Sequence, residues 1–158
     1  MRNCKSFYIW TEDRYGVKFF DCLLKRIERE LGVEISQHRK VQSTMGDGVM
    51  DSKIVKLARA GWIRHDCVIF IRDGDRKQKK IYEKLNKKIS DLPKENNKHA
   101  VIIVFDKAIE SDWLKKGTGG QLPDNYDKAE LPDYANKVDI NLLREDANFI
   151  KFVSAVDP

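Results

Sequence analysis

The residues best suited to chemistry in this chain are Asp73 and Asp75, which closely follow the apolar run 67–71. An unbroken apolar run that ends in acids and a glycine is typical of a strand buried on both faces of a parallel sheet. Alternate residues leaving a strand project to the same side, so both carboxylates can point into one crevice at the edge where open α/β sheets bind ligands. Two carboxylates held that close repel each other, which favours a bound divalent cation. The alternative explanation is an ordinary strand exit through an Asx turn, with Gly74 in the left-handed conformation.

Two further apolar runs, 6–10 and 100–105, are also followed by acids. Glu12 and Asp13 follow the first of these runs, and Asp106 follows the second. The helix expected after the second run contributes one more acid, Glu110. Acids at a helix start cap unpaired N–H groups and match the helix dipole. We expect Asp13 to cap the helix that follows it, which leaves Glu12 to point toward the crevice.

In a parallel sheet the carboxyl ends of neighbouring strands lie at one edge, so Glu12, Asp73 and Asp75 are expected to converge there. Hard oxygen ligands of this kind suit Mg²⁺, with Mn²⁺ as a substitute. A pair of such ions about 4 Å apart can activate water and stabilise the leaving oxygen during phosphodiester cleavage. The acids therefore predict a metal site at the carboxyl edge of the sheet.

The apolar spacing predicts the elements that must position these acids. The expected strands are 6–10, 33–36, 67–71 and 100–105, and the expected helices are 20–31, 54–58, 81–89, 109–114, 140–143 and 149–156. Residues 37–50 are expected to form a long loop, 117–134 an extended surface segment, and Asp51 a helix cap. This order predicts an α/β, three-layer, Rossmann-like fold with a mostly parallel central sheet of about four strands flanked by helices. The length favours one domain, 1–158, in which 117–158 form a C-terminal extension of a loop and two short helices.

The composition is that of a globular, soluble chain, with 41% hydrophobic and 35% charged residues. No apolar run approaches the length of a membrane span, so we expect no membrane partner. The polar start 1–5 lacks the apolar region of a signal peptide. Cys4, Cys22 and Cys67 are odd in number and widely spaced. This usage predicts reduced thiols in the cytoplasm, and neither a disulfide framework nor a zinc site.

A net charge of +5 and a pI near 9.0 favour a polyanionic partner, though only weakly. The helix 81–89 and the turn before it carry a run of basic residues, namely Arg76, Lys77, Lys79, Lys80, Lys84, Lys87 and Lys88. Such a run is usually a solvated helix face, but beside an acidic crevice it can contact a phosphate backbone, and that contact would be sensitive to salt. The residues we expect to contact nucleic acid are Arg39, Lys40, Arg76, Lys77 and Lys80.

At these residues the sequence resembles the Toprim domain of topoisomerases, bacterial-type primases and OLD-family nucleases. Glu12 resembles the glutamate of that family, and Asp73-Gly74-Asp75 resembles its Asp-x-Asp motif. The segment 109–114, the triplet 126–128 and the Phe-x-x-Phe pair at 149–152 resemble small stand-alone Toprim-like proteins related to the OLD nucleases. The likeness covers most of the chain, although each motif is short.

The resemblance implies metal-dependent hydrolysis of a nucleic acid, either DNA or RNA. In that case Asp73 and Asp75 hold Mg²⁺, and Glu12 either joins them or acts as general base on the attacking water. Glu110 is implied as an auxiliary ligand or as a residue that orients the ligands. Lys128 is implied to stabilise negative charge on the phosphate, and its alternative is an ordinary surface lysine.

The chain also departs from the Toprim pattern. Family members usually carry a glycine directly after the glutamate and an acid four residues beyond it, where this sequence has Asp13 and Gly16. The change favours the alternative of a non-catalytic Toprim-like module that binds nucleic acid or a protein. We expect no second domain of the kind that selects a substrate in primases and topoisomerases. A larger partner protein is therefore expected to supply that selection, and a homodimer is a further expectation.

A phospho-receiver domain is the third interpretation, because receivers also gather acids at strand ends. Glu12 and Asp13 would be its acidic pair, Asp73 its acceptor and Lys107 its lysine. Against it, the basic residues that follow Asp75 are unlike the loop of a receiver, and a fifth strand–helix unit is missing.

Overall fold

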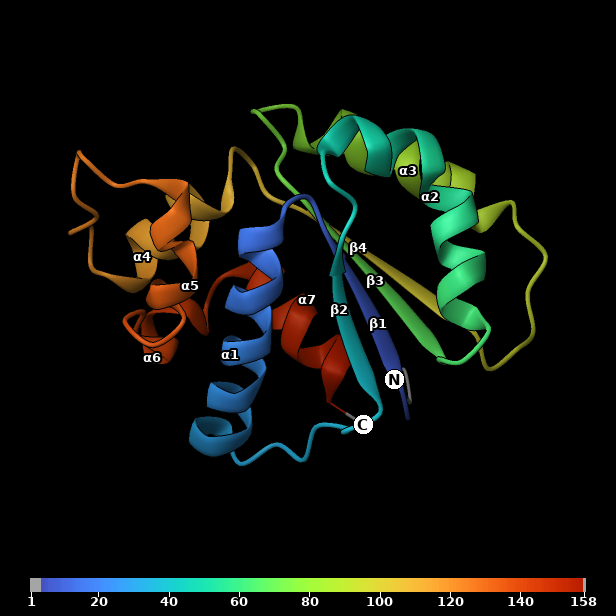
Figure 1. The fold of residues 1–158 in the computed structure, drawn as a ribbon, viewed down its shortest axis with the longest axis horizontal. Helices are drawn as coiled ribbons and strands as arrows, with labels where there is room; N and C mark the ends of the chain where they lie inside the picture. Colours follow the sequence, from blue (N-terminus) through green and yellow to red (C-terminus); the bar gives the residue numbers. More distant parts are fainter. Residues whose placement is uncertain (1–3, 158) are drawn as a thin grey trace.

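The computed structural model describes residues 4–157, which form a four-stranded sheet with helices on both faces (Figure 1). The strands are β1 (Phe7–Thr11), β2 (Arg39–Ser43), β3 (Cys67–Arg72) and β4 (His99–Val104). All neighbours pair in parallel, in the order β2-β1-β3-β4. The predicted α/β class with a parallel sheet of about four strands is confirmed.

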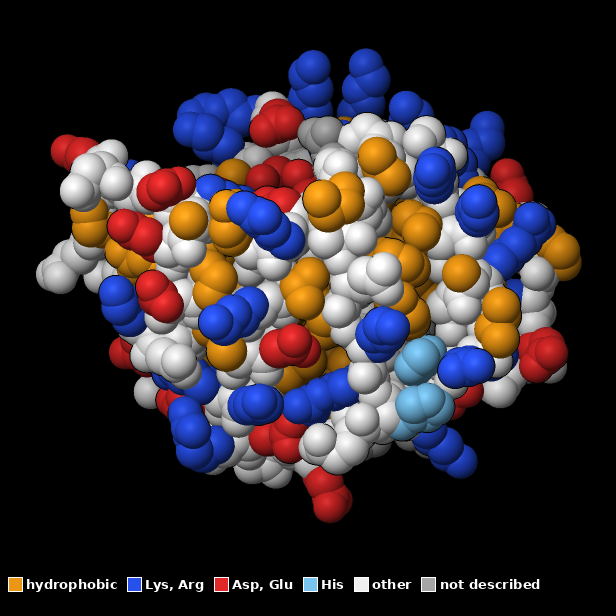
Figure 2. Space-filling view, in the orientation of Figure 1, with side chains coloured by type: hydrophobic (Ala, Val, Ile, Leu, Met, Phe, Trp, Pro, Cys, Tyr) orange, Lys and Arg blue, Asp and Glu red, His pale blue; other side chains and the backbone are white. Residues whose placement is uncertain are grey.

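The helices form two layers. Helices α2 (Asp47–Trp62) and α3 (Gln78–Ser90) cover one face of the sheet, and α1 (Arg14–Leu31) and α7 (Ala147–Val156) cover the other (Figure 1). The short helices beside α1 are the π-helix η1 (Glu110–Leu114), α4 (Lys115–Gly117), the 3₁₀ helix η2 (Lys128–Glu130), α5 (Leu131–Tyr134) and α6 (Ile140–Leu143). Lys and Arg side chains gather along the edge formed by α2 and α3 (Figure 2).

Alternation along the strands divides the core in two. Phe7 and Ile9 of β1 pack toward α1, whereas Trp10 packs toward α2 and α3. In β3, Ile69 joins the first core and Phe70 the second. Both faces of these strands are therefore buried, which is why β3 appears in the sequence as an unbroken apolar run.

The turn from β1 into α1 has the predicted geometry. The side chain of Asp13 accepts a hydrogen bond from the backbone N–H of Gly16 at 3.0 Å and so caps α1. Gly32 ends the helix in the left-handed conformation, with a φ of 63°. The prediction that Asp13 serves as the cap is confirmed.

Some boundaries were predicted wrongly. The second strand is β2, which lies inside the predicted loop 37–50, and residues 33–36 form no strand. β2 is an edge strand of alternating half-buried and exposed residues, so it has no apolar run to reveal it. Asp51 does not cap α2, because the helix already begins at residue 47. The segment 117–134, predicted as extended, contains η2 and α5.

The prediction of unpaired cysteines is also wrong. Cys4 and Cys67 form a disulfide, with Cα atoms 5.6 Å apart, and Cys22 remains a thiol. The pairing follows from the sheet, because Phe7 lies opposite Cys67 and the chain before β1 runs past the start of β3. Residues 1–3 of the predicted polar start lie outside the described residues. Within 4–157, no helix is long and apolar enough to cross a membrane.

The C-terminal extension, 117–158, is tied to α1 by Arg26. The guanidinium of this largely buried side chain donates to the carbonyl oxygen of Ala135 at 3.0 Å and to that of Val138. It also forms an ion pair with Glu30 on the next turn of α1. Because the two carbonyls come from the end of α5 and the loop after it, one side chain holds that part of the extension against the core.

Replacing Arg26 with Met should lower the free energy of unfolding by about 2–3 kcal/mol, because two buried carbonyl oxygens lose a charged donor. Urea unfolding of the variant measures this change. Arg29→Met is the matched control, since Arg29 is exposed on the same helix and should change stability by less than about 0.5 kcal/mol. Equal losses in the two variants would contradict the assigned role of Arg26.

Candidate functional site

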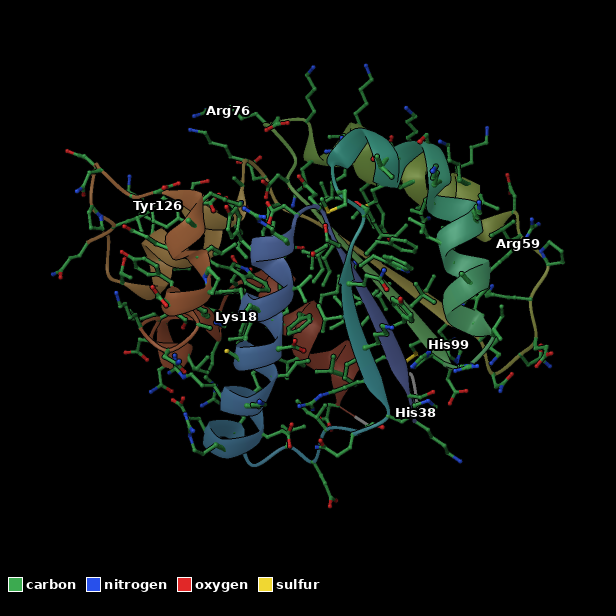
Figure 3. The ribbon with its side chains drawn as sticks, in the orientation of Figure 1. Lys18, His38, Arg59, Arg76, His99 and Tyr126 are labelled. Atoms are coloured by element: carbon green, nitrogen blue, oxygen red, sulfur yellow. A yellow bond between two sulfur atoms is a disulfide. The ribbon has the colours of Figure 1, made fainter. Side chains whose placement is uncertain are left out.

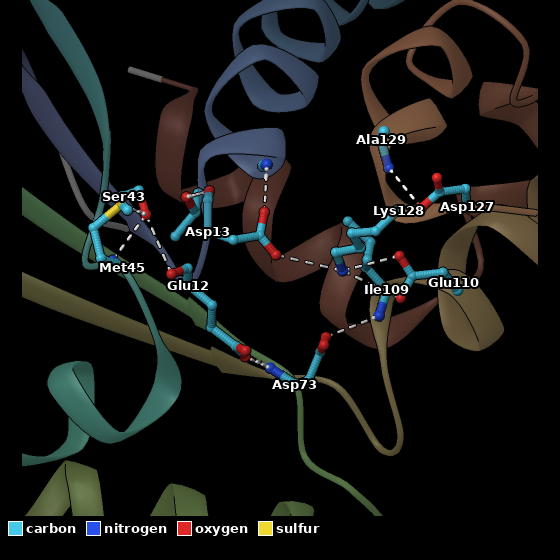
Figure 4. A network of polar contacts seen from close by, with 12 residues as sticks. Glu12, Asp13, Ser43, Met45, Asp73, Ile109, Glu110, Asp127, Lys128 and Ala129 are labelled. Atoms are coloured by element: carbon cyan, nitrogen blue, oxygen red, sulfur yellow. Dashed lines mark hydrogen bonds and ion pairs between the residues drawn. The ribbon is translucent and has the colours of Figure 1, made fainter.

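The carboxyl ends of β1 and β3 place Glu12 next to Asp73. The two strands are paired in parallel with Trp10 opposite Phe70, so they end at nearly the same level. The carboxylate of Glu12 accepts a hydrogen bond from the backbone N–H of Asp73 (Figure 4). The backbone of Glu12 is itself fixed, because its carbonyl accepts from Gly46 N–H at 2.6 Å.

The side chain of Asp73 points toward the layer of the molecule that contains α1. Its Oδ1 accepts a hydrogen bond of 3.0 Å from the backbone N–H of Ile109, just before η1 (Figure 4). Burial raises the pKa of Asp73 from 3.8 to about 6, although the nearby Lys128 ammonium acts to lower it. Small changes in the surroundings of a carboxyl with this pKa are enough to change its protonation state near neutral pH.

Lys128 lies among carboxylates at the mouth of the site. Its Nζ is 3.0 Å from Oε2 of Glu110 and 3.7 Å from Oδ2 of Asp13. The hydroxyl of Tyr126 donates to the same Glu110 oxygen at 3.0 Å. Burial acts to lower the pKa of Lys128, but Glu110 and the other carboxylates outweigh it, and the pKa lies above its ordinary value. Lys128 is therefore a protonated, anchored side chain.

Burial and the neighbouring Glu110 also raise the pKa of Tyr126, so its hydroxyl keeps its proton and acts as a donor. Tyr126 (Figure 3) and Lys128 (Figure 4) come from the extension, whereas Glu110 belongs to η1 (Figure 4). The extension thus completes the site that the sheet begins.

Asp75 occupies a different position from the other predicted ligands. It is exposed on the turn after β3, where its backbone N–H donates to the carbonyl of Lys107 at 2.9 Å. Its charge still contributes to raising the pKa of Asp73. Among the side chains that the structure describes, no three from His, Cys, Asp and Glu come together as a group that could hold a metal ion. The structure thus joins Glu12 with Asp73 and leaves Asp75 on the adjoining turn.

Glycine is required at position 74, but not for the expected left-handed conformation. The left-handed residues of this turn are Asp75 and Arg76, with φ of 47° and 65°, and Gly74 is not among them. A Cβ on Gly74 would lie 1.9 Å from the carbonyl oxygen of Phe105. The turn therefore needs glycine because the chain after β4 approaches it closely.

An ion pair that sequence reasoning missed supports Asp73 from the α2 side. Arg72 donates through Nε and Nη2 to the two carboxylate oxygens of Asp51, at 2.7 and 2.8 Å. Its Nη1 donates to the carbonyl oxygen of Asp73. The partners are twenty-one positions apart, which conceals the pair in the sequence, and only the polar Arg72 at the end of an apolar strand indicated it.

These groups border a cleft of about 300 Å³, counted together with its open mouth. Its lining combines the carboxylates with apolar side chains such as Phe20 and Leu131. The lining includes three acids, Glu12, Asp13 and Asp73, against two cations, Lys128 and Arg72, and the Arg72 guanidinium is paired with a fourth carboxylate from α2. This excess of negative charge, partly removed from water, is the property of the cleft that a cation would relieve.

The residues expected to contact nucleic acid separate into two groups. Arg76, Lys77 and Lys80 are exposed beside the cleft, and Arg76 projects from the turn before α3 (Figure 3). Arg39 and Lys40 begin β2 at the opposite end of the sheet, and Arg39 forms an ion pair of 2.6 Å with a glutamate of α1.

Comparison of the chain with protein-family models, with curated proteins and with solved structures finds no match. The interpretation of the cleft therefore depends on its own geometry and charge.

Replacing Gly74 with Ala should displace the turn that carries Asp73, because the new Cβ would overlap the Phe105 carbonyl. We expect a loss of about 1–3 kcal/mol in the free energy of unfolding, measured by urea titration. Gly48→Ala in α2 is the control, since a Cβ there meets no atom within 4 Å. A Gly74→Ala variant as stable as the Gly48→Ala variant would refute the close approach.

The raised pKa of Asp73 predicts a specific dependence of stability on pH. Between about pH 4 and 6 the folded state binds a proton at Asp73 more tightly than the unfolded state does, so the contribution of Asp73 to stability falls as the pH rises through this window. Asp73→Asn removes this dependence, and its stability relative to the parent should therefore increase from pH 4 to pH 6 and then level off. Urea unfolding at stepped pH values measures it.

A matched variant tests the cause of that pKa. Lys128→Met should move the pKa of Asp73 further upward, because the ammonium of Lys128 lowers it. Carboxyl ¹³C NMR titration gives the midpoint directly. A midpoint near 4 in the parent chain would show that Asp73 is not desolvated as described.

Proposed function

We propose that this protein hydrolyses phosphodiester bonds of nucleic acid with the help of Mg²⁺ or Mn²⁺. The observation that carries the proposal is the meeting of Glu12 and Asp73 at the end of two adjacent parallel strands, with Lys128 close by. This edge is where open α/β sheets bind their ligands. The Toprim-like spacing of the same residues in the sequence supports the same chemistry.

The two carboxylates of Glu12 and Asp73 suit Mg²⁺ better than a metal ion whose ligands must all come from the protein. Mg²⁺ is commonly held by one or two carboxylates and keeps several of its waters. Glu12 and Asp73 would supply those carboxylates, and Asp75 and Glu110, whose charges act on the pKa of Asp73, would be auxiliary groups. Such an ion would supply an activated water and would neutralise charge on the leaving oxygen. Its binding would also lower the raised pKa of Asp73.

The other side chains of the site would act on the substrate. Lys128 is held protonated by Glu110 and Asp13, so it is suited to bind a phosphate oxygen and to stabilise negative charge there. The Asp73 N–H fixes the Glu12 carboxylate, which is then oriented either to bind the ion or to accept a proton from water. Arg72 acts on Asp73 indirectly, as a positioning residue, through the Asp73 carbonyl.

A second candidate is a binding module without catalysis. One observation favours it, because Lys128 already pairs with Glu110 and Asp13 and so neutralises part of the charge that would attract a cation. The receiver interpretation has less support, since the lysine that acts on the pKa of Asp73 is Lys128 of the extension, whereas Lys107 is exposed.

Cleavage of labelled DNA and RNA should require Mg²⁺ or Mn²⁺ and should stop when EDTA is added. Asp73→Asn and Glu12→Gln should each lower the rate at least about 100-fold, which exceeds the usual effect of a residue that only orients a ligand. Gel-resolved time courses of the purified variants measure the rates. Asp124→Asn, an exposed acid of the extension, is the control and should cleave at the parent rate.

The outcomes distinguish the two candidates. Cleavage that survives Asp73→Asn would place the activity outside this cleft and overturn the proposal. Binding of nucleic acid without any cleavage in Mg²⁺ or Mn²⁺ would favour the non-catalytic module.

A further inference from the structure

The positive charge of this protein is concentrated in one short segment. Residues 75–91 hold seven Lys and Arg against three acids, a net charge of +4. The whole chain carries +5, so all the other residues together contribute only +1. The weak overall basicity thus reflects a local surface, and the rest of the molecule is close to neutral.

That surface is formed by α3, the turn before it and the adjacent α2, and we call it the basic face. Its exposed cations are Lys53, Lys56 and Arg59 on α2, and Arg76, Lys77, Lys79, Lys80, Lys84 and Lys87 on the turn and α3. Figure 2 shows Lys and Arg side chains extending from this edge of the molecule. Among the side chains that the structure describes, none of these nine forms an ion pair with a carboxylate.

The cations are arranged on a rigid support. Lys80, Lys84 and Lys87 recur at helical spacing, so they form one stripe on the side of α3 away from the buried Leu85. The ammonium of Lys88 donates to the carbonyl of Asp51 at 2.8 Å and joins α3 to α2. Like charges held this close repel one another, and a polyanion would relieve that repulsion.

The basic face lacks the groups that bind single strands. Proteins that hold single-stranded nucleic acid stack its bases on exposed aromatic rings. None of the fifteen Phe, Trp and Tyr side chains of this chain is exposed. Tyr82, the ring of α3, is half-buried and has the Lys151 ammonium 4.5 Å from its centroid. A double helix needs no stacking surface, because it presents its phosphates outward.

We infer that the basic face binds the backbone of double-stranded nucleic acid without regard to sequence, and leads it to the cleft. The route is continuous, since only the turn 74–77 separates Asp73 from α3. This inference rests on the proposed function for the choice of nucleic acid as partner, but it does not require catalysis.

Fluorescence anisotropy in EDTA tests the inference with labelled DNA and RNA duplexes and with their single strands, between about 50 and 200 mM salt. The parent chain should bind a duplex at least about 10-fold more tightly than the single strand, with an affinity that falls steeply with salt. Lys80→Glu with Lys84→Glu should weaken duplex binding at least about 10-fold and reduce the slope of log affinity against log salt by about two.

Lys18→Glu with Lys25→Glu is the matched control, because it makes the same change in charge at exposed positions of α1, on the other side of the sheet (Figure 3). It should alter duplex affinity by less than about threefold, since binding depends on the face and not on net charge alone. Lys80→Gln with Lys84→Gln repeats the test with a smaller perturbation, and circular dichroism checks that each variant is folded.

Two results would overturn the inference, namely equal losses in the α3 and α1 variants, or single strands bound as tightly as duplexes. Failure of the proposed function looks different. A chain that binds duplexes through the basic face but cleaves nothing in Mg²⁺ keeps the inference and loses the nuclease proposal.

Discussion

The pairing of β1 with β3 is the constraint on which the rest of the structure depends. Parallel strands that end level place the residue after one strand beside the residue after the other, and here the Glu12 carboxylate bonds to the backbone of Asp73. On its other side β1 pairs with β2, and this contact continues past the end of β1, because Thr44 N–H and Gly46 N–H donate to the carbonyls of Thr11 and Glu12. Glu12 is therefore fixed through its backbone on one side and its carboxylate on the other.

Asp13 serves both the helix that follows it and the lysine of the cleft. One of its oxygens caps α1 through Gly16, and the other faces Lys128. Gly16 packs closely against β1, because a Cβ there would lie 3.0 Å from the side chain of Thr11. The acid after Glu12 thus supports the helix and positions the lysine, a combination of tasks that a glycine could not perform.

The sequence was most informative where burial alone decides structure. The runs that became β1, β3 and β4 are buried on both faces, and their ends therefore revealed Glu12 and Asp73. β2 was not predicted because its residues alternate between half-buried and exposed and form no apolar run. Its pairing with β1, and not its own composition, makes it a strand. The Cys4–Cys67 disulfide and the Arg72–Asp51 pair depend on contacts between distant segments, which residue spacing does not encode.

Asp73 is hydrogen-bonded from the sides of both helical layers at once, and its position connects the cleft with the basic face. From the α1 side, the Ile109 N–H bonds to its carboxylate, and from the α2 side Arg72 bonds to its carbonyl. The turn that leaves Asp73 continues directly into the basic face, and its backbone is pinned by the chain after β4. A ligand that pulled on this turn would therefore change the surroundings of the Asp73 carboxyl. Because that carboxyl has a pKa of about 6, a small change in its solvation is enough to alter its charge near neutral pH.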